Sequence, residues 1–146
     1  MVGVEIDLVV GDSLKALAFY HEVFGVKTLE VSNYEKGLNE AVFDLYGTRI
    51  HLLDENPEYQ LIAPKEGDNT SIWINVMVEN IRSAYKKALD NGGTKIQEVV
   101  EQRELLISNA IFKDPSGHIW MLHQMNQPVS TQEKANYLEE KFGKGH

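Results

Sequence analysis

Over residues 4–10 of the chain, Ile6, Leu8 and Val10 fall on one face and the acidic Glu5 and Asp7 on the other. This period of two predicts a β-strand with one buried face. Over residues 12–24 the apolar positions are spaced by three and four residues, which is typical of an amphipathic helix. Asp12 and Ser13 are suitable N-cap residues for that helix, and Gly25 is a suitable stop. Three short strands are expected to follow, over residues 28–31, 40–45 and 48–53.

The same order of patterns repeats in the second half of the chain. A polar stretch with two prolines, at residues 54–69, separates the halves and is expected to be a surface loop. Residues 71–78 then alternate as a strand, and Asn80 can cap a helix that stops at Gly92. Strands are expected next over residues 95–100, 105–112 and 118–125. The sequence therefore predicts an α+β fold of two βαβββ modules in tandem.

The length of 146 residues suits one domain, or two small halves that share a core. We expect a first module at residues 1–56, a linker loop at 57–70, a second module at 71–125 and a C-terminal helical extension at 126–146. The extension carries a third helical pattern over residues 130–142, with Ser130 and Glu133 as a capping box. This helix stands outside the repeat.

Composition narrows the classes of partner. The chain has no cysteine, which excludes disulfides, thiolate metal sites and cysteine nucleophiles. A net charge of −8 argues against binding to nucleic acid or to an anionic membrane. It suits a cationic ligand, although it also serves solubility alone. The N-terminus does not read as a signal peptide, and no apolar run reaches the ~20 residues of a membrane span, so a cytoplasmic protein is expected.

Two motifs carry a resemblance to a known family. The first helix and its entry read DSLKALAFYHEVFG, with Asp12 before it, Phe19-Tyr20 within it and Gly25 after it; the second half ends on DPSGHIWML, from Asp114 onward. Together these resemble the signature of the vicinal oxygen chelate superfamily (glyoxalase, bleomycin-resistance and extradiol dioxygenase-like proteins), over about residues 4–125. The tryptophan three residues after the last glycine is more similar to the PhnB-like (demethylubiquinone methyltransferase-like) subgroup.

The resemblance implies that the two modules form a curved mixed sheet around a cleft, with the helices packed outside. Strand alternation then sorts the side chains between the two faces. The face toward the helices is expected to hold Ile6, Leu8, Ile50, Leu52, Ile72, Ile74, Val76, Trp120 and Leu122. The ligand-binding cleft is expected to be lined by Glu5, Asp7, Arg49, His51, Trp73, Asn75, Met121 and His123.

Metal binding is the first property that the resemblance brings into question. The superfamily's enzymes hold a divalent ion at four positions, which correspond here to Glu5, His51, Trp73 and Met121. Glu5 and His51 suit Zn, Ni, Mn or Fe, whereas an indole cannot ligate and a thioether is too soft. Two ligands fall short of the three that catalytic sites usually keep. Asp7 or His123, one pleat away, would have to complete the set, so the pattern favours a cleft without a standard metal site.

Three functions stay open at this point. The first is a small-molecule-binding protein that sequesters a cationic or aromatic compound. Trp73 would offer it a flat surface, and Glu5 and Asp7 would lie beside its positive group. When no ligand is bound, Arg49 could pair with these two carboxylates. The second is a divalent-metal-dependent lyase, isomerase or dioxygenase, with Glu5 as both ligand and catalytic base. The third is metal-free acid–base catalysis by Glu5 or His51. The resemblance also implies a homodimer.

Overall fold

The computed structural model describes residues 2–126, 135, 136 and 139. Its first half contains β1 (Ile6–Val10), α1 (Ser13–Phe24), β2 (Lys27–Val31), β3 (Glu40–Leu45) and β4 (Thr48–Asp54). Its second half contains β5 (Trp73–Met77), α2 (Ile81–Asp90), β6 (Thr94–Gln102), β7 (Ile107–Lys113) and β8 (Ile119–Met125). Short 3-10 turns lie at Pro57–Tyr59 and Arg103–Leu105. The helix predicted over residues 130–142 falls, apart from 135, 136 and 139, outside the described residues.

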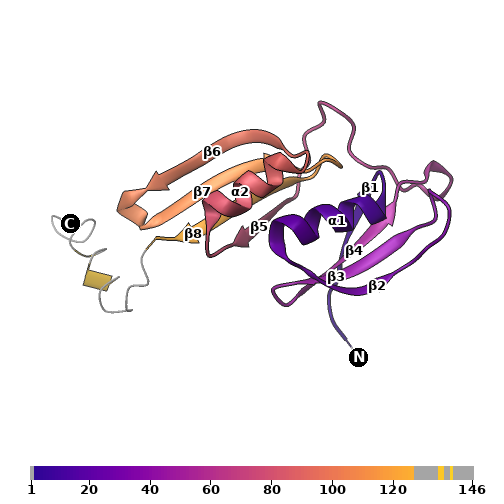
Figure 1. The fold of residues 1–146 in the computed structure, drawn as a ribbon, viewed down its shortest axis with the longest axis horizontal. Helices are drawn as coiled ribbons and strands as arrows, with labels where there is room; N and C mark the ends of the chain where they lie inside the picture. The colour runs from indigo at the N-terminus through magenta and orange to yellow at the C-terminus, as the bar shows by residue number, and fades with distance from the viewer. Residues whose placement is uncertain (1, 127–134, 137–138, 140–146) are drawn as a thin grey trace.

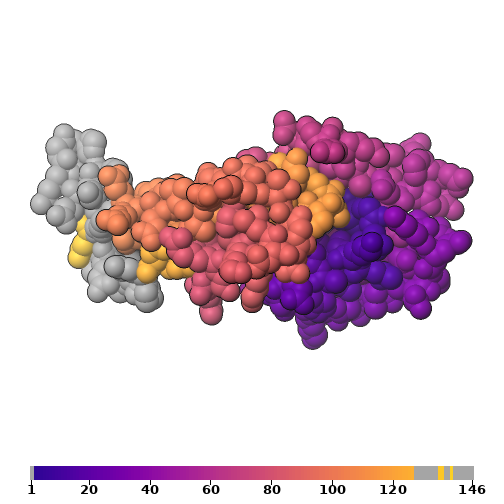
Figure 2. Space-filling model, turned by 45° about the horizontal axis from the view of Figure 1, so that its top comes forward, coloured from indigo at the N-terminus to yellow at the C-terminus, as the bar shows by residue number. Residues whose placement is uncertain are grey.

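Each half forms one four-stranded mixed sheet. The strand orders are β1-β4-β3-β2 and β5-β8-β7-β6, and only the β1–β4 and β5–β8 pairs are parallel. Each helix covers one face of its own sheet, and α1 and α2 lie beside each other in the middle of the molecule (Figure 1). The two sheets do not close into a barrel, and the space-filling view shows an elongated molecule with the halves side by side (Figure 2). The predicted α+β fold of two βαβββ modules is confirmed.

Helix ends follow the predicted caps. The Asp12 carboxylate accepts the backbone N–H groups of Leu14 and Lys15, which have no partner within the helix. Gly25 ends α1 in the left-handed conformation, with φ 63°, that a residue without a Cβ adopts most easily. In the second half, Asn80 accepts the N–H of Ser83. Among the described residues, no helix is long and apolar enough to span a membrane.

The two modules share one hydrophobic core, which joins them across α1. The Tyr20 ring lies 5.1 Å from that of Trp120, and the Phe24 ring lies 5.3 Å from the same indole, measured between ring centroids. Phe19 approaches Phe112 to 6.1 Å. Because α1 belongs to the first module and both partner rings to the second, the core spans the repeat. Phe19 and Tyr20 of the first motif are buried and pack the two modules together.

Strand alternation predicted most of the buried face correctly. Leu8, Ile50, Leu52, Val76, Trp120 and Leu122 are all buried against the helices. Ile74 is partly buried, whereas Ile6 is 37% exposed. Ile72 is 73% exposed, because it precedes β5, which begins at Trp73. Polar residues 68–71 precede it, so the apolar pattern alone could not fix where the strand begins.

A buried carboxylate holds the loop that leads into β3. Asp54 ends β4 and accepts the backbone N–H groups of Ser13 at 2.7 Å, Gly37 at 2.9 Å and Asn39 at 3.0 Å. Burial pushes the pKa of Asp54 upward, but these hydrogen bonds outweigh it and hold the pKa below its usual value. Since Asn39 precedes Glu40, this anchor fixes the start of β3 beside β4.

Candidate metal and ligand site

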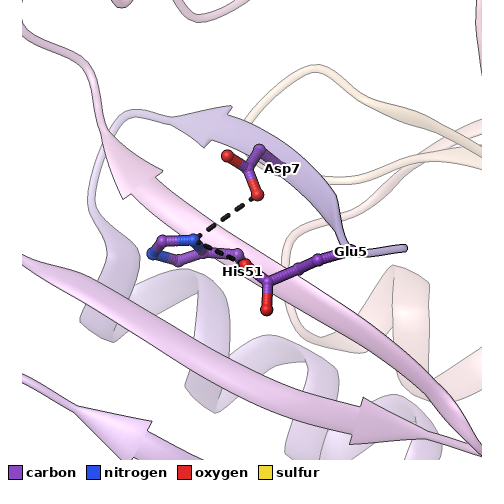
Figure 3. A group of neighbouring side chains, drawn as sticks. All are labelled: Glu5, Asp7 and His51. Atoms are coloured by element: carbon purple, nitrogen blue, oxygen red, sulfur yellow. Dashed lines mark ion pairs between the residues drawn. The ribbon is translucent and has the colours of Figure 1, made fainter. Parts of the chain in front are cut away.

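Three predicted side chains meet on the face of the first sheet that points away from α1 (Figure 3). The parallel register pairs Asp7 of β1 with His51 of β4, and Glu5 stands just before β1. The His51 Nδ1 atom lies 3.1 Å from Glu5 Oε1 and 3.4 Å from Asp7 Oδ1. One donor atom of each residue lies within 4.8 Å of the other two. We call Glu5, Asp7 and His51 the acidic–histidine cluster.

Glu40 is a fourth residue near His51, and the sequence analysis did not identify it. Its Oε2 atom lies 3.8 Å from His51 Nε2. That nitrogen is buried and has no hydrogen-bond partner in the described part of the chain. The antiparallel register pairs Val42 with His51, so Glu40 is a diagonal neighbour on the same face. The alternation of residues 40–45 placed Glu40 on one face with Val42, but only the pairing of β3 with β4 brings it to His51.

Arg49 fixes the orientation of Glu5. Its Nε atom donates to Glu5 Oε2 at 2.9 Å, which leaves Oε1 directed at His51. This hydrogen bond is the main reason that the pKa of Glu5 lies below its usual value, with the charges of His51 and Arg49 adding to it against slight burial. The expected Arg49–Glu5 pair is therefore present, and Glu5 is held ionised.

The other predicted cleft residues form a separate group on the second sheet. Trp73, Asn75, Met121 and His123 stand on the face of β5 and β8 opposite the buried Val76 and Leu122. Within this group, His123 Nδ1 lies 2.6 Å from Asn75 Oδ1. Among the described residues, no hydrogen bond or ion pair joins this group to the acidic–histidine cluster. A single cleft lined by all eight residues stays a prediction.

Cavities occur on the helix side of the molecule. One of about 580 Å³ lies between α1, Pro64 and the turn at Pro115, and another of about 710 Å³ lies between the end of α1 and the start of α2. Neither is lined by any of the eight predicted cleft residues. The eight predicted residues therefore lie away from both of these cavities, on the sheet faces described above.

Comparison with known proteins identifies the family. The model of the Glyoxalase/Bleomycin resistance protein/Dioxygenase superfamily matches residues 4–122. The chain belongs to this superfamily. No curated protein matches the sequence.

Solved structures of the superfamily share the fold at low sequence identity. FosX, a fosfomycin resistance protein from Listeria monocytogenes, is 17% identical, with 92% of this chain and 98% of FosX covered and a TM-score of 0.63. TioX from Micromonospora sp. ML1 is also 17% identical, with 86% and 99% covered and a TM-score of 0.63. The hypothetical protein SA1046 from S. aureus is 20% identical, with 85% and 94% covered and a TM-score of 0.63. FosX has been crystallised with Mn(II) and sulfate.

Within the superfamily frame, the structure changes which residues form a donor set. Two of the four family metal positions hold residues that can ligate, Glu5 and His51, and these two lie together. Trp73 and Met121 lie on the other sheet, as part of a different group. The third donor beside His51 is Asp7, from the same strand edge as Glu5. The first module therefore assembles three donors by itself, and of the two substitutes that the sequence offered, Asp7 and His123, it is Asp7 that lies beside His51.

Proposed function

We propose that this superfamily member binds a divalent metal ion through Glu5, Asp7 and His51, and that it acts on a small oxygen-bearing molecule with the help of that ion. The observation that carries the proposal is the convergence of two carboxylates on one imidazole nitrogen, at 3.1 and 3.4 Å. One nitrogen and two oxygen donors suit Zn, Ni, Mn or Fe. Three protein ligands with a further open position are typical of catalytic centres.

The surroundings of His51 support this donor set. If Nδ1 ligates, then Nε2 carries the proton, and the nearest acceptor for it is Glu40 Oε2 at 3.8 Å. Metal-ligating histidines usually direct their second N–H at a carboxylate or carbonyl, which fixes the tautomer and raises the basicity of the ligand. Nε2 is buried and has no hydrogen-bond partner among the described residues, so Glu40 is the acceptor that its N–H could reach by a small movement of the side chain.

The chain's own residues define what the site would do. A bound ion supplies a Lewis acid for an oxygen atom of a small molecule. Arg49 keeps Glu5 oriented and ionised, so Glu5 is ready to ligate or to accept a proton at Oε1. The corresponding reaction classes are lyase, isomerase and dioxygenase. The structural relative FosX, crystallised with Mn(II), supports metal use in this fold.

A second candidate function is the sequestration of an organic cation without a metal. Glu5, Asp7 and Glu40 place three carboxylates around His51 on one sheet face, and Arg49 pairs with Glu5. On the second sheet, Trp73 is 47% exposed and offers an indole to an aromatic or cationic group. This candidate requires no nucleophile or general acid.

We further propose a cytoplasmic homodimer of the PhnB-like kind, on the resemblance stated above. The edge strands β2 and β6 expose Val31, Ile96 and Val100, and an unpaired edge with apolar side chains is prone to pair with another chain. Size-exclusion chromatography with light scattering is expected to give twice the monomer mass of 16.6 kDa at micromolar concentration. A mass of one chain would contradict the dimer.

The metal proposal is tested on the purified protein by elemental analysis, followed by thermal melts with Zn, Ni, Mn, Co and Fe(II) after chelation. An ion at 100 times its dissociation constant is expected to stabilise the protein by ~2.7 kcal/mol. For a chain of this size that corresponds to a rise in melting temperature of roughly 5–10 °C. No ion and no shift with any of these metals would contradict metal dependence, and binding of organic amines to the same face would then be measured.

A further inference from the structure

The second sheet carries a chemically different group of donors from the first. β5 and β8 are parallel neighbours, and their register pairs Met77 with His123 and Asn75 with Met121. Because successive side chains of a strand alternate, Met77, Met121, His123 and Met125 share the face opposite the buried Val76 and Leu122. Three of the four methionines of the chain therefore stand on one open face around one histidine.

The His123 ring is oriented by the side-chain oxygen of Asn75, which can only accept a hydrogen bond. His123 Nδ1 lies 2.6 Å from Asn75 Oδ1, and since an amide oxygen has no proton to give, Nδ1 must donate. The neutral ring then has its lone pair on Nε2, on the far side of the ring from Asn75. Nε2 has no hydrogen-bond partner in the described residues. A carbonyl that holds the second nitrogen of a histidine is the usual outer contact of a metal ligand.

The donors around this nitrogen are soft and uncharged. Met77 is 58% exposed and Met125 is 40% exposed, so both thioethers are accessible and can rotate about three bonds. Neighbouring strands lie ~4.8 Å apart and same-face residues of a strand ~7 Å apart, within the reach of these side chains. Neither β5 nor β8 contains an aspartate or a glutamate. A neutral thioether and imidazole set suits a soft monovalent ion and does little to neutralise a divalent one.

We propose that the open face of the second sheet binds a soft monovalent cation, Cu(I) or Ag(I), through His123 Nε2 and the sulfur atoms of Met77 and Met125. Asn75 is a positioning residue that keeps Nε2 free of its proton. Met121 is the register partner of Asn75, which holds Nδ1, and is not among the proposed ligands. This site is separate from the acidic–histidine cluster, which offers hard oxygen donors to a divalent ion.

The test is a titration of the full-length protein with Ag(I), and with Cu(I) under anaerobic reducing conditions against a chromophoric Cu(I) chelator. One equivalent is expected to bind. Substitutions H123A, M77L and M125L are each expected to weaken binding by roughly 10–100-fold or more, and N75L by a similar factor. M121L makes the same chemical change on the same face and is the matched control, expected to leave the affinity within about threefold, as is H21A on α1.

A second measurement uses the wild-type protein and so does not depend on how the variants fold. Methyl resonances of ¹³C-labelled methionine give one signal for each of the four methionines. Ag(I) is expected to shift the signals of Met77 and Met125 and to leave that of Met121 in place. Binding that survives H123A and M77L, a largest shift at Met121, or no uptake in competition with the chelator would each overturn the proposal. Because divalent ions are absent from this experiment, failure here is distinguishable from failure of the metal function proposed above.

Discussion

Replacing Asp114 by alanine is expected to lower the free energy of unfolding by about 3–5 kcal/mol, because buried donors from both modules lose their acceptor together. Its carboxylate is buried and accepts hydrogen bonds from the Tyr20 hydroxyl, from Trp120 Nε1 at 2.8 Å, and from the backbone N–H groups of Ser116 at 2.9 Å and His118 at 3.0 Å. Urea denaturation followed by circular dichroism measures the change. A loss below ~1 kcal/mol would show that water replaces the carboxylate without cost.

Tyr20→Phe is the graded control, since it removes one donor and leaves the other three. A loss of about 1–2 kcal/mol is expected, well below that of Asp114→Ala. Burial, followed by the charge of Asp114, raises the pKa of Tyr20 well above its usual value. The unfolded chain therefore releases this proton first, so the wild type should lose stability as the pH rises past about 10, and Tyr20→Phe should lose less over that range.

Removing His51 is expected to abolish the binding of a divalent ion, whereas removing its outer partner should only weaken it. In His51→Ala the two carboxylates keep no nitrogen donor, and the affinity should fall by more than the ~10–100-fold expected for Glu40→Gln, which removes only the acceptor near Nε2. Isothermal titration with Zn or Mn measures both. The described geometry predicts this order because Glu5 and Asp7 face Nδ1, whereas Glu40 faces Nε2.

Glu30→Gln is the matched control for Glu40→Gln, because it removes one carboxylate from the neighbouring strand β2. Its effect on ion affinity is expected to stay within about threefold, as for a screened surface charge. Equal losses in both variants would mean that the ion responds to the net charge of the sheet and not to a coordinated site. Unchanged affinity in His51→Ala would remove the proposed centre.

The sequence predicted the fold well because its signals are local. Alternation gave the strands, the spacing of three and four gave both helices, and Asp12 and Asn80 marked where the helices begin. The main error was at Ile72, because β5 begins two residues later than the pattern suggested and so leaves Ile72 outside the strand. Strand ends depend on which neighbour continues the ladder, and that information lies elsewhere in the chain.

The candidate site was predicted in its residue types but not in its grouping. Glu5, Asp7 and His51 were all assigned to the open face, yet their convergence depends on the parallel register that sets Asp7 beside His51. Glu40 was missed for the same reason, because β3 meets β4 only through a hairpin register. The four metal positions of the superfamily are divided between the two modules. In the structure, three possible donors lie together on the first sheet, and Met121 lies on the second.

The hydrogen bond between Tyr20 and Asp114 has one partner in each repeat, and so does that between His118 Nε2 and the Val9 carbonyl at 2.7 Å. Neither repeat has a hydrophobic core of its own, since Tyr20 and Phe24 of α1 pack against Trp120 of the other repeat. The duplicated halves have thus become unequal and are no longer interchangeable. A mutation in the shared core of one half must remain compatible with the side chains of the other half. The two open sheet faces are not part of that core, so their residues can change more freely.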